Sequence, residues 1–177
     1  MTIFKRYKSF FIFLFILFIM YFYKKEIGLK AIDISLFSLK EMLIIIPPIF
    51  ILLGLLDVWV PKETMMKYLG EGSGIKGTLL AFFIGSAAAG PLYGAFPIAG
   101  LLLKKGAKLS NVFIFIGAWS TTKIPMFLFE IASMGIKFAV IRMFLNIPVI
   151  ILISIILSKN LAKHEKEEIY ARAKLIK

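Results

Sequence analysis

Cysteine is absent from the 177-residue chain, and histidine occurs only once, as His164. The lack of thiols excludes structural disulfides and thiolate metal sites. The chain also has no His-Glu-x-x-His motif and no Walker-type phosphate loop, so neither zinc-protease chemistry nor nucleotide hydrolysis is expected. We therefore expect no enzymatic activity, no resident metal and no cofactor.

Acidic residues are also scarce: 10 Asp and Glu stand against 22 Lys and Arg, which gives a net charge of +12. In a soluble protein this excess would suggest nucleic acid as a partner. Here 60% of the residues are hydrophobic and 18 are Phe, against roughly 45–50% apolar residues in soluble domains. The basic residues lie between and beside apolar runs, where they meet anionic headgroups and set orientation. The partner we expect is the lipid bilayer, not nucleic acid.

The apolar runs predict an all-α integral membrane protein with about five transmembrane helices, because each crossing takes roughly 20 residues. The length then leaves room for a single membrane domain, residues 1–177, and for no separate soluble domain. The predicted crossings are 9–23, 42–60, 77–103, 109–135 and 136–158, and a charged tail follows at 159–177.

The first run, 9–23, follows basic residues and could also be a signal peptide, but no small-residue cleavage site comes after it. We interpret it as a short transmembrane helix. Residues 31–41 are interpreted as a connector, with an interfacial helix as the alternative. Pro47 and Pro48 predict a bend in the second crossing, since each removes a backbone donor.

The distribution of Lys and Arg predicts the orientation. Five crossings place thirteen of these residues on one side of the membrane and seven on the other. If both interrupted segments were re-entrant hairpins, the counts would be ten and ten. The positive-inside rule therefore favours five crossings of the cytoplasmic membrane, with the tail at 159–177 in the cytoplasm.

The segments 77–103 and 109–135 are each interrupted near the middle by small, polar or proline residues. In lipid, every backbone N–H and C=O must find a partner, so such interruptions are tolerated only where protein or a watered cavity covers them. Two successive interrupted segments indicate a transporter's substrate site.

In the first of these segments Ser86, Gly90 and Gly94 recur every four residues, which favours close helix approach. Helix packing alone is the alternative explanation. Pro91 follows Gly90, and a break there would expose the N-terminus of a second half-helix, which attracts anionic groups. Tyr93 would place a phenol close by.

The second interruption places three hydroxyls, those of Ser120, Thr121 and Thr122, and the ammonium of Lys123 before Pro125. A hydroxyl is expected to cap a new half-helix that has Pro125 in its first turn. A lysine in an apolar segment costs roughly 2.5–3.5 kcal/mol at its centre and marks a functional candidate. The alternative is an ion pair with Glu130, for which Arg142 competes. The candidate substrate-binding or coupling residues are Gly90, Pro91, Tyr93, Gly94, Ser120, Thr121, Thr122, Lys123 and Glu130.

The stretch 90–125, GPLYGAFPIAGLLLKKGAKLSNVFIFIGAWSTTKIP, resembles the YraQ-like predicted permeases, which include organoarsenical efflux permeases. The resemblance covers about residues 40–158. It implies a Pro-x-Cys-Ser-Cys-Gly stretch, but Leu92, Tyr93 and Gly94 lie near the place of those cysteines, which disfavours thiolate capture of trivalent arsenic. Larger members contain two such halves. The resemblance therefore implies a half-size unit that forms a homodimer, or a heterodimer with a related half-size permease.

These observations predict a permease that moves a small solute across the cytoplasmic membrane. An anion, an oxyanion or an organoarsenical-type compound is the candidate substrate, and the resemblance suggests efflux. Without nucleotide hydrolysis, a gradient or a partner must drive transport. The alternative is a non-transporting membrane scaffold or assembly subunit. A passive channel would require a continuous polar lining, which the sequence barely supplies.

Overall fold

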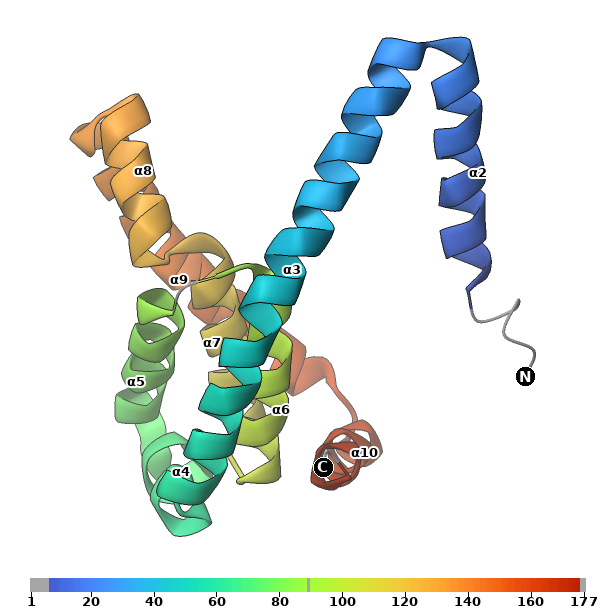
Figure 1. Cartoon of the computed structure of the whole chain (residues 1–177). Helices are drawn as coiled ribbons and strands as arrows, with labels where there is room; N and C mark the ends of the chain where they lie inside the picture. The colour runs from blue at the N-terminus through green and yellow to red at the C-terminus, as the bar shows by residue number, and fades with distance from the viewer. Residues whose placement is uncertain (1–6, 89, 176–177) are drawn as a thin grey trace. The chain divides into compact units, whose positions relative to one another are not determined.

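The computed structural model describes residues 7–88 and 90–175, and every regular element in this part of the chain is a helix (Figure 1). The predicted all-α class is confirmed. The elements are α2 (Lys8–Tyr23), α3 (Lys25–Trp59), α4 (Lys62–Leu69), η1 (Glu71–Ser73), α5 (Gly74–Ala87), η2 (Leu92–Gly94), α6 (Ala95–Lys104), α7 (Leu109–Thr121), α8 (Ile124–Met134), α9 (Ile136–Asn160) and α10 (Lys163–Lys174).

Within the described residues, three helical stretches are long and apolar enough to cross a membrane: Lys25–Trp59, Leu109–Met134 and Ile136–Asn160. The second stretch comprises α7 and α8 together. Helix α2 is apolar but has only 16 residues, which corresponds to about 24 Å against a hydrocarbon core of about 30 Å. The chain is therefore an all-helical membrane protein, and a total of five crossings stays a prediction.

The chain divides into two compact units, residues 1–48 and 49–177. In the first unit, Gly28 lies so close to α2 that a Cβ there would be 2.4 Å from the Tyr21 Cα. The connector expected at 31–41 is wrong, because these residues belong to α3, which continues through Pro47 and Pro48. No glycine or proline lies between Gly28 and Pro47, so nothing in the backbone ends the helix there.

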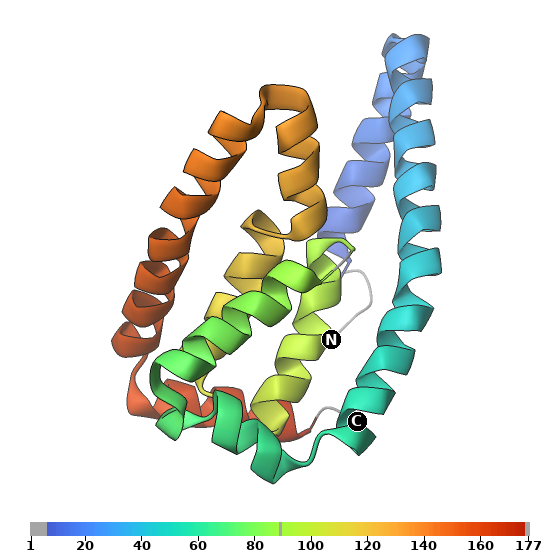
Figure 2. The same ribbon diagram turned by 90° about the vertical axis from the view of Figure 1, so that its left-hand side faces the viewer.

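In the second unit, α5 and α6 form a hairpin and run in opposite directions, so the chain returns to the end where α5 begins (Figure 2). The Lys108 N–H donates a hydrogen bond to the Leu69 carbonyl at 2.8 Å, and the Asn111 amide donates to the same carbonyl at 2.9 Å. We call this end of the unit the base. The structure thus has two helices, α5 and α6, in place of one continuous helix over 77–103. The turn is made where Gly90 has a φ of 102°, which favours glycine, and Pro91 follows it.

Helix α7 packs against both arms of the hairpin, and the hydrophobic core lies around its Val112, Ile114 and Phe115. The two helices approach closely at Gly85 of α5, where a Cβ would be 2.4 Å from the Phe115 carbonyl oxygen. The predicted strip of Ser86, Gly90 and Gly94 does not form one helix face, because α5 ends at Ala87.

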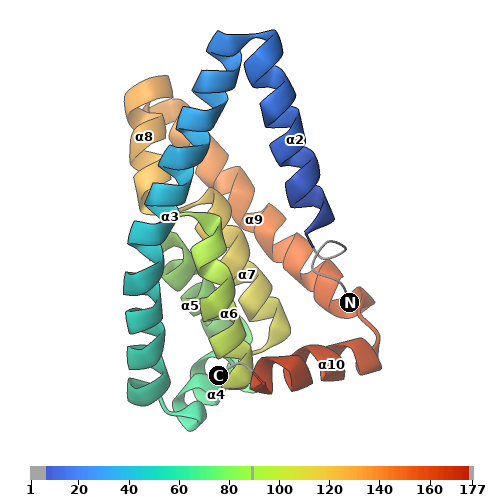
Figure 3. The same cartoon turned by 45° about the vertical axis from the view of Figure 1, so that its right-hand side comes forward.

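Helices α8 and α9 form a second antiparallel pair, and α9 returns to the base (Figure 2). Helix α9 also packs against α7. Gly117 of α7 allows this close packing, since a Cβ at that position would be 2.9 Å from the Ile150 side chain of α9. The tail helix α10 lies across the base beside the end of α6 (Figure 3). Its Tyr170 hydroxyl donates to the Ala107 carbonyl at 3.0 Å. Burial and the charge of Glu71 raise the pKa of Tyr170, which keeps this donor protonated.

A buried lysine closes the last turn of α3. The Lys105 ammonium donates to the carbonyls of Leu56, Asp57 and Val60 at 3.1, 2.6 and 2.5 Å, and Lys105 is only 6% exposed. The Asp57 carboxylate lies 3.3 Å from this ammonium and 3.6 Å from that of Lys104. The Leu56 carbonyl also accepts from the Val60 N–H at 3.2 Å. Lys105 therefore adds a charged donor to the carbonyls at the end of α3 and places positive charge at the helix C-terminus.

Lys105→Met is expected to lower the free energy of unfolding by roughly 1.5–3 kcal/mol, the usual value of hydrogen bonds to a charged group. Lys104→Met is the matched control and should cost less than about 1 kcal/mol, because it removes only a surface ion pair. Thermal unfolding of the purified protein in detergent measures both. Equal effects of the two substitutions would contradict the capping role of Lys105.

Candidate functional site

The two predicted interruptions meet in the structure. The Lys123 ammonium donates to the Gly90 carbonyl at 2.9 Å, and the Trp119 indole N–H donates to the same oxygen at 3.2 Å. Gly90 lies at the turn of the hairpin, while Trp119 and Lys123 flank the end of α7. The carbonyl freed where α5 stops is thus satisfied by the other interrupted segment.

Two hydroxyls make a second link between the same elements. Ser86 Oγ of α5 lies 3.0 Å from Thr122 Oγ1. The Thr122 hydroxyl also donates to the Ala118 carbonyl at 3.1 Å, so Ser86 is the donor in the link to Thr122. Thr122 is 4% exposed. The structure therefore brings Gly90, Thr122 and Lys123 together, as the sequence predicts.

The hydroxyl cap predicted for α8 is wrong. Lys123 occupies the N-cap position, no side chain caps the helix, and Pro125 lies in the first turn as predicted. Ser120 and Thr121 instead donate to the Gly117 carbonyl at 3.0 and 2.8 Å. Hydroxyls in the last turn of α7 reach the carbonyls three and four residues back more readily than the next helix. No side-chain hydroxyl therefore satisfies the first N–H groups of α8.

The remaining candidates of the first interruption have different environments. Pro91 has an extended conformation and leads into η2. Gly94 is buried, and a Cβ there would lie 2.5 Å from the Ile49 side chain, so it permits close approach of α3. Tyr93 is 39% exposed, and its phenol makes no hydrogen bond within the part of the chain that the structure describes. Tyr93 is therefore free to meet a solute or another chain.

Glu130 is paired with Arg142, not with Lys123. The Arg142 Nε lies 2.6 Å from Glu130 Oε2, and Glu130 is 5% exposed. The antiparallel packing of α8 and α9 places these two residues opposite each other. Arg142 Nη2 is buried and, among the described residues, has no hydrogen-bond partner. The structure thus resolves the competition for Glu130 in favour of Arg142.

The second interruption lies near the middle of its segment. Helix α7 has 13 residues and α8 has 11, which correspond to about 20 Å and about 16 Å of helix. Their combined stretch, Leu109–Met134, has 26 residues. Its helical length of about 39 Å exceeds the thickness of a hydrocarbon core, roughly 30 Å. Lys123 therefore lies near the middle of this apolar stretch.

Trp119 is the residue that sequence reasoning missed. A tryptophan in a membrane protein usually lies in the interfacial belt, whereas Trp119 lies inside an apolar segment and is 3% exposed. That position is a signal that the indole N–H needs a buried acceptor. No group of three side chains that could hold a metal occurs in residues 7–88 and 90–175.

Two interrupted hydrophobic segments joined at their breaks define a polytopic helical membrane protein of transporter type. The comparison with known families agrees: a model of the ArsP-type family, described as predicted permease, matches residues 29–176. The chain belongs to this family, which confirms the resemblance seen in its sequence. No curated protein and no solved structure matches the chain.

Proposed function

We propose that the protein is a permease for a small anionic solute, with its site where the Gly90–Pro91 turn meets the junction of α7 and α8. One observation carries this proposal. In a chain of a predicted permease family, the Lys123 ammonium bonds the Gly90 carbonyl at the meeting point of the two interruptions.

The chemistry of this site favours an oxygen-rich anion. An ammonium has three donors, and the structure gives Lys123 one acceptor, the Gly90 carbonyl. The first turn of α8, which has no side-chain cap, adds backbone N–H groups and partial positive charge. In the absence of thiols, an oxyanion or an organoarsenical-type compound would bind through its oxygen atoms.

The contacts at the site also suggest how binding is coupled to movement. The Lys123, Trp119 and Ser86 hydrogen bonds hold the hairpin turn against the junction of α7 and α8. A bound anion would compete with the Gly90 carbonyl for the Lys123 ammonium and weaken this contact. Glu130 and Arg142, on α8 and α9, would then respond to movement of α8 as the coupling pair. We propose that this series of events, from anion binding to movement of α8, links the site to transport.

The hairpin brings basic residues from separate parts of the chain to the base, and this charge supports a cytoplasmic location of the base. Within the described residues of the second unit, the base carries three Lys in 62–76, three in 104–108 and five Lys and Arg in 159–174, whereas Lys137 is the one basic residue between α8 and the first turn of α9. The positive-inside rule places the base and the tail in the cytoplasm. A C-terminal green fluorescent protein fusion should fluoresce and an alkaline phosphatase fusion should be inactive. The reverse result would contradict this orientation in the cytoplasmic membrane.

A dimer is also part of the proposal. The chain has only 177 residues, and the family resemblance implies larger members with two such halves. A second copy, or a related half-size chain, would supply the other half. The alternative is a non-transporting scaffold. It would explain the packing of the two interruptions, but it assigns no solute to the Lys123 ammonium.

The test is a thermal-shift screen of the purified protein in detergent with anions, metal ions and organoarsenicals, on the wild type and on Lys123→Met. A ligand that binds only the folded state raises the melting temperature. We expect an oxyanion or an oxygen-bearing organoarsenical to stabilise the wild type and not the variant. If no compound shifts the wild type and the variant melts higher, the scaffold explanation replaces the permease.

A further inference from the structure

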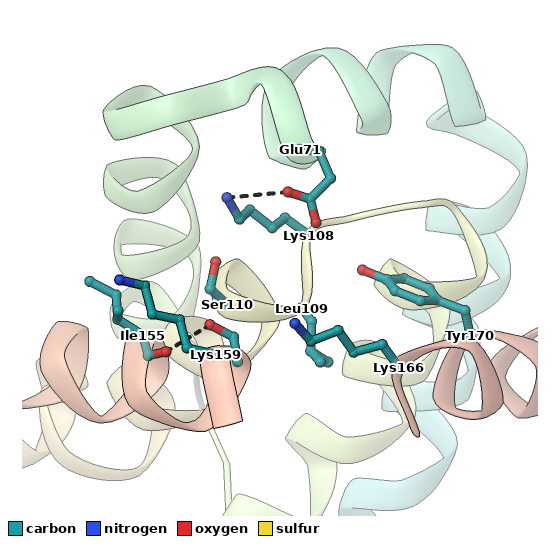
Figure 4. Close-up of a pocket in the computed structure, with 9 residues that line it drawn as sticks. Glu71, Lys108, Leu109, Ser110, Ile155, Lys159, Lys166 and Tyr170 are labelled. Atoms are coloured by element: carbon teal, nitrogen blue, oxygen red, sulfur yellow. Dashed lines mark hydrogen bonds and ion pairs between the residues drawn. The ribbon is translucent and has the colours of Figure 1, made fainter. Parts of the chain in front are cut away.

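A second polar site lies at the base, away from Lys123. It is a cavity of about 440 Å³ between the start of α7, the end of α9 and the tail helix α10. Figure 4 shows lysines from three different elements around it: Lys108 before α7, Lys159 on α9 and Lys166 on α10. Because distant parts of the chain contribute these charges, the cluster is a product of the fold and not of a basic sequence run.

The charge in the cavity is only partly compensated. Lys108 lies 3.2 Å from the Glu71 carboxylate, and this ion pair is exposed. Lys159 and Lys166 have no ion pair within the described residues. Three ammonium groups therefore face one carboxylate, so the cavity attracts an anion.

The unpaired hydroxyl of a buried serine adds a second, independent sign of a ligand. Ser110 is 7% exposed, and its side chain points into the cavity (Figure 4). Its hydroxyl makes no hydrogen bond within residues 7–88 and 90–175, so it is free to donate to a group in the cavity. Ser110 also lies in the first turn of α7, where backbone N–H groups lack partners within the helix.

We propose that this cavity binds a phosphate group, held by the ammonium groups of Lys108, Lys159 and Lys166 and by the Ser110 hydroxyl. The volume exceeds that of one ion, and Leu109 and Ile155 give it an apolar wall, so a phospholipid headgroup with its glycerol fits. A free phosphate offers the same chemistry. Basic pockets beside transmembrane helices on the cytoplasmic side are known to take anionic headgroups.

The bound phosphate would tie the tail to the membrane part of the chain. Lys166 is on α10, which also packs against α6 and donates the Tyr170 hydroxyl to the Ala107 carbonyl. A ligand shared by Lys159, Lys166 and Ser110 joins α9, α10 and α7. This proposal does not depend on the Lys123 site or on the permease activity.

The experiment compares three probes on the full-length protein in an uncharged detergent: short-chain phosphatidylglycerol, phosphatidylcholine with the same acyl chains, and sodium phosphate. The variants are Lys159→Gln/Lys166→Gln and Ser110→Ala. The control is Lys163→Gln/Lys174→Gln, which removes the same charge from α10 outside the cavity. Thermal shift gives the stabilisation, and titration gives the dissociation constant.

We expect phosphatidylglycerol, and not phosphatidylcholine, to stabilise the wild type and the control. The Lys159/Lys166 variant should bind it roughly 10- to 30-fold more weakly, since each basic residue near an anionic surface contributes about one kcal/mol. Ser110→Ala should also bind more weakly while its ligand-free melting temperature is unchanged. Stabilisation by sodium phosphate alone, lost in the same variants, would identify a free anion as the ligand. Equal affinity of the Lys159/Lys166 variant and the control, or no shift with any probe, would overturn the proposal.

Discussion

Lys123→Met is expected to abolish anion transport while the protein stays folded. The substitution removes the charge that the site offers to a solute, and loss of a charge-assisted hydrogen bond weakens binding by roughly 10- to 100-fold. It also removes the cost of placing an ammonium in an apolar segment. The Gly90 carbonyl keeps a partner, because the Trp119 indole still donates to it. The melting temperature should therefore stay near that of the wild type or rise.

Counterflow in proteoliposomes, with phosphate, arsenate and an oxygen-bearing organoarsenical as labelled probes, measures the effect. Lys137→Met is the matched control, since it removes an exposed lysine beyond the site and should transport like the wild type. Lys123→Arg keeps the charge and should retain part of the activity. Full transport by Lys123→Met would show that the ammonium is not part of the site.

The interruptions and their contact could be predicted from the sequence because membrane physics leaves few options. The backbone groups left unpaired by an interruption at Gly90 and Pro91, and the hydroxyls and ammonium before Pro125, all need partners that lipid cannot supply. Two interrupted segments that each lack partners are best satisfied by each other. The hydrogen bonds of Lys123 and Trp119 to Gly90 follow this logic.

The direction of the chain through the hairpin could not be predicted in the same way. The 27 uncharged residues of 77–103 are equally apolar whether the chain crosses once or turns back. The deciding contact joins Leu69 to Lys108, and no local pattern reports a pairing 39 positions apart. The charge counts compared five crossings with two hairpins, and they did not include an arrangement in which only one of the two segments turns back.

Lys105 and Arg142 show a related limit. A lysine at the end of an apolar run is usually placed among headgroups, but Lys105 folds inward onto three carbonyls of α3. Arg142 belongs to a different helix from Glu130, and only the packing of α8 against α9 selects this pair. Side-chain partners across helices depend on tertiary packing, which periodicity and composition do not encode.

Glu130→Ala is expected to be the most destabilising single change in the second unit. It would leave the Arg142 guanidinium uncompensated, and Arg142 Nη2 already lacks a partner among the described residues. Breaking a buried ion pair typically costs about 3–5 kcal/mol, which corresponds to a fall in melting temperature of roughly 6–20 °C for a chain of this size. Glu168→Ala is the matched control, because it breaks the exposed pair with Arg172 and should cost less than about 1 kcal/mol.

The double variant Glu130→Leu/Arg142→Leu separates structure from transport. Replacing both partners of a buried pair by apolar residues is often neutral or stabilising, so this variant should melt within a few degrees of the wild type. If it also transports, the pair only joins α8 to α9. If it is stable and inactive, the charges themselves take part in transport, which is what coupling through α8 requires. A loss of stability as large as that of Glu130→Ala would instead show that the packing around the pair, and not its charge, holds the two helices together.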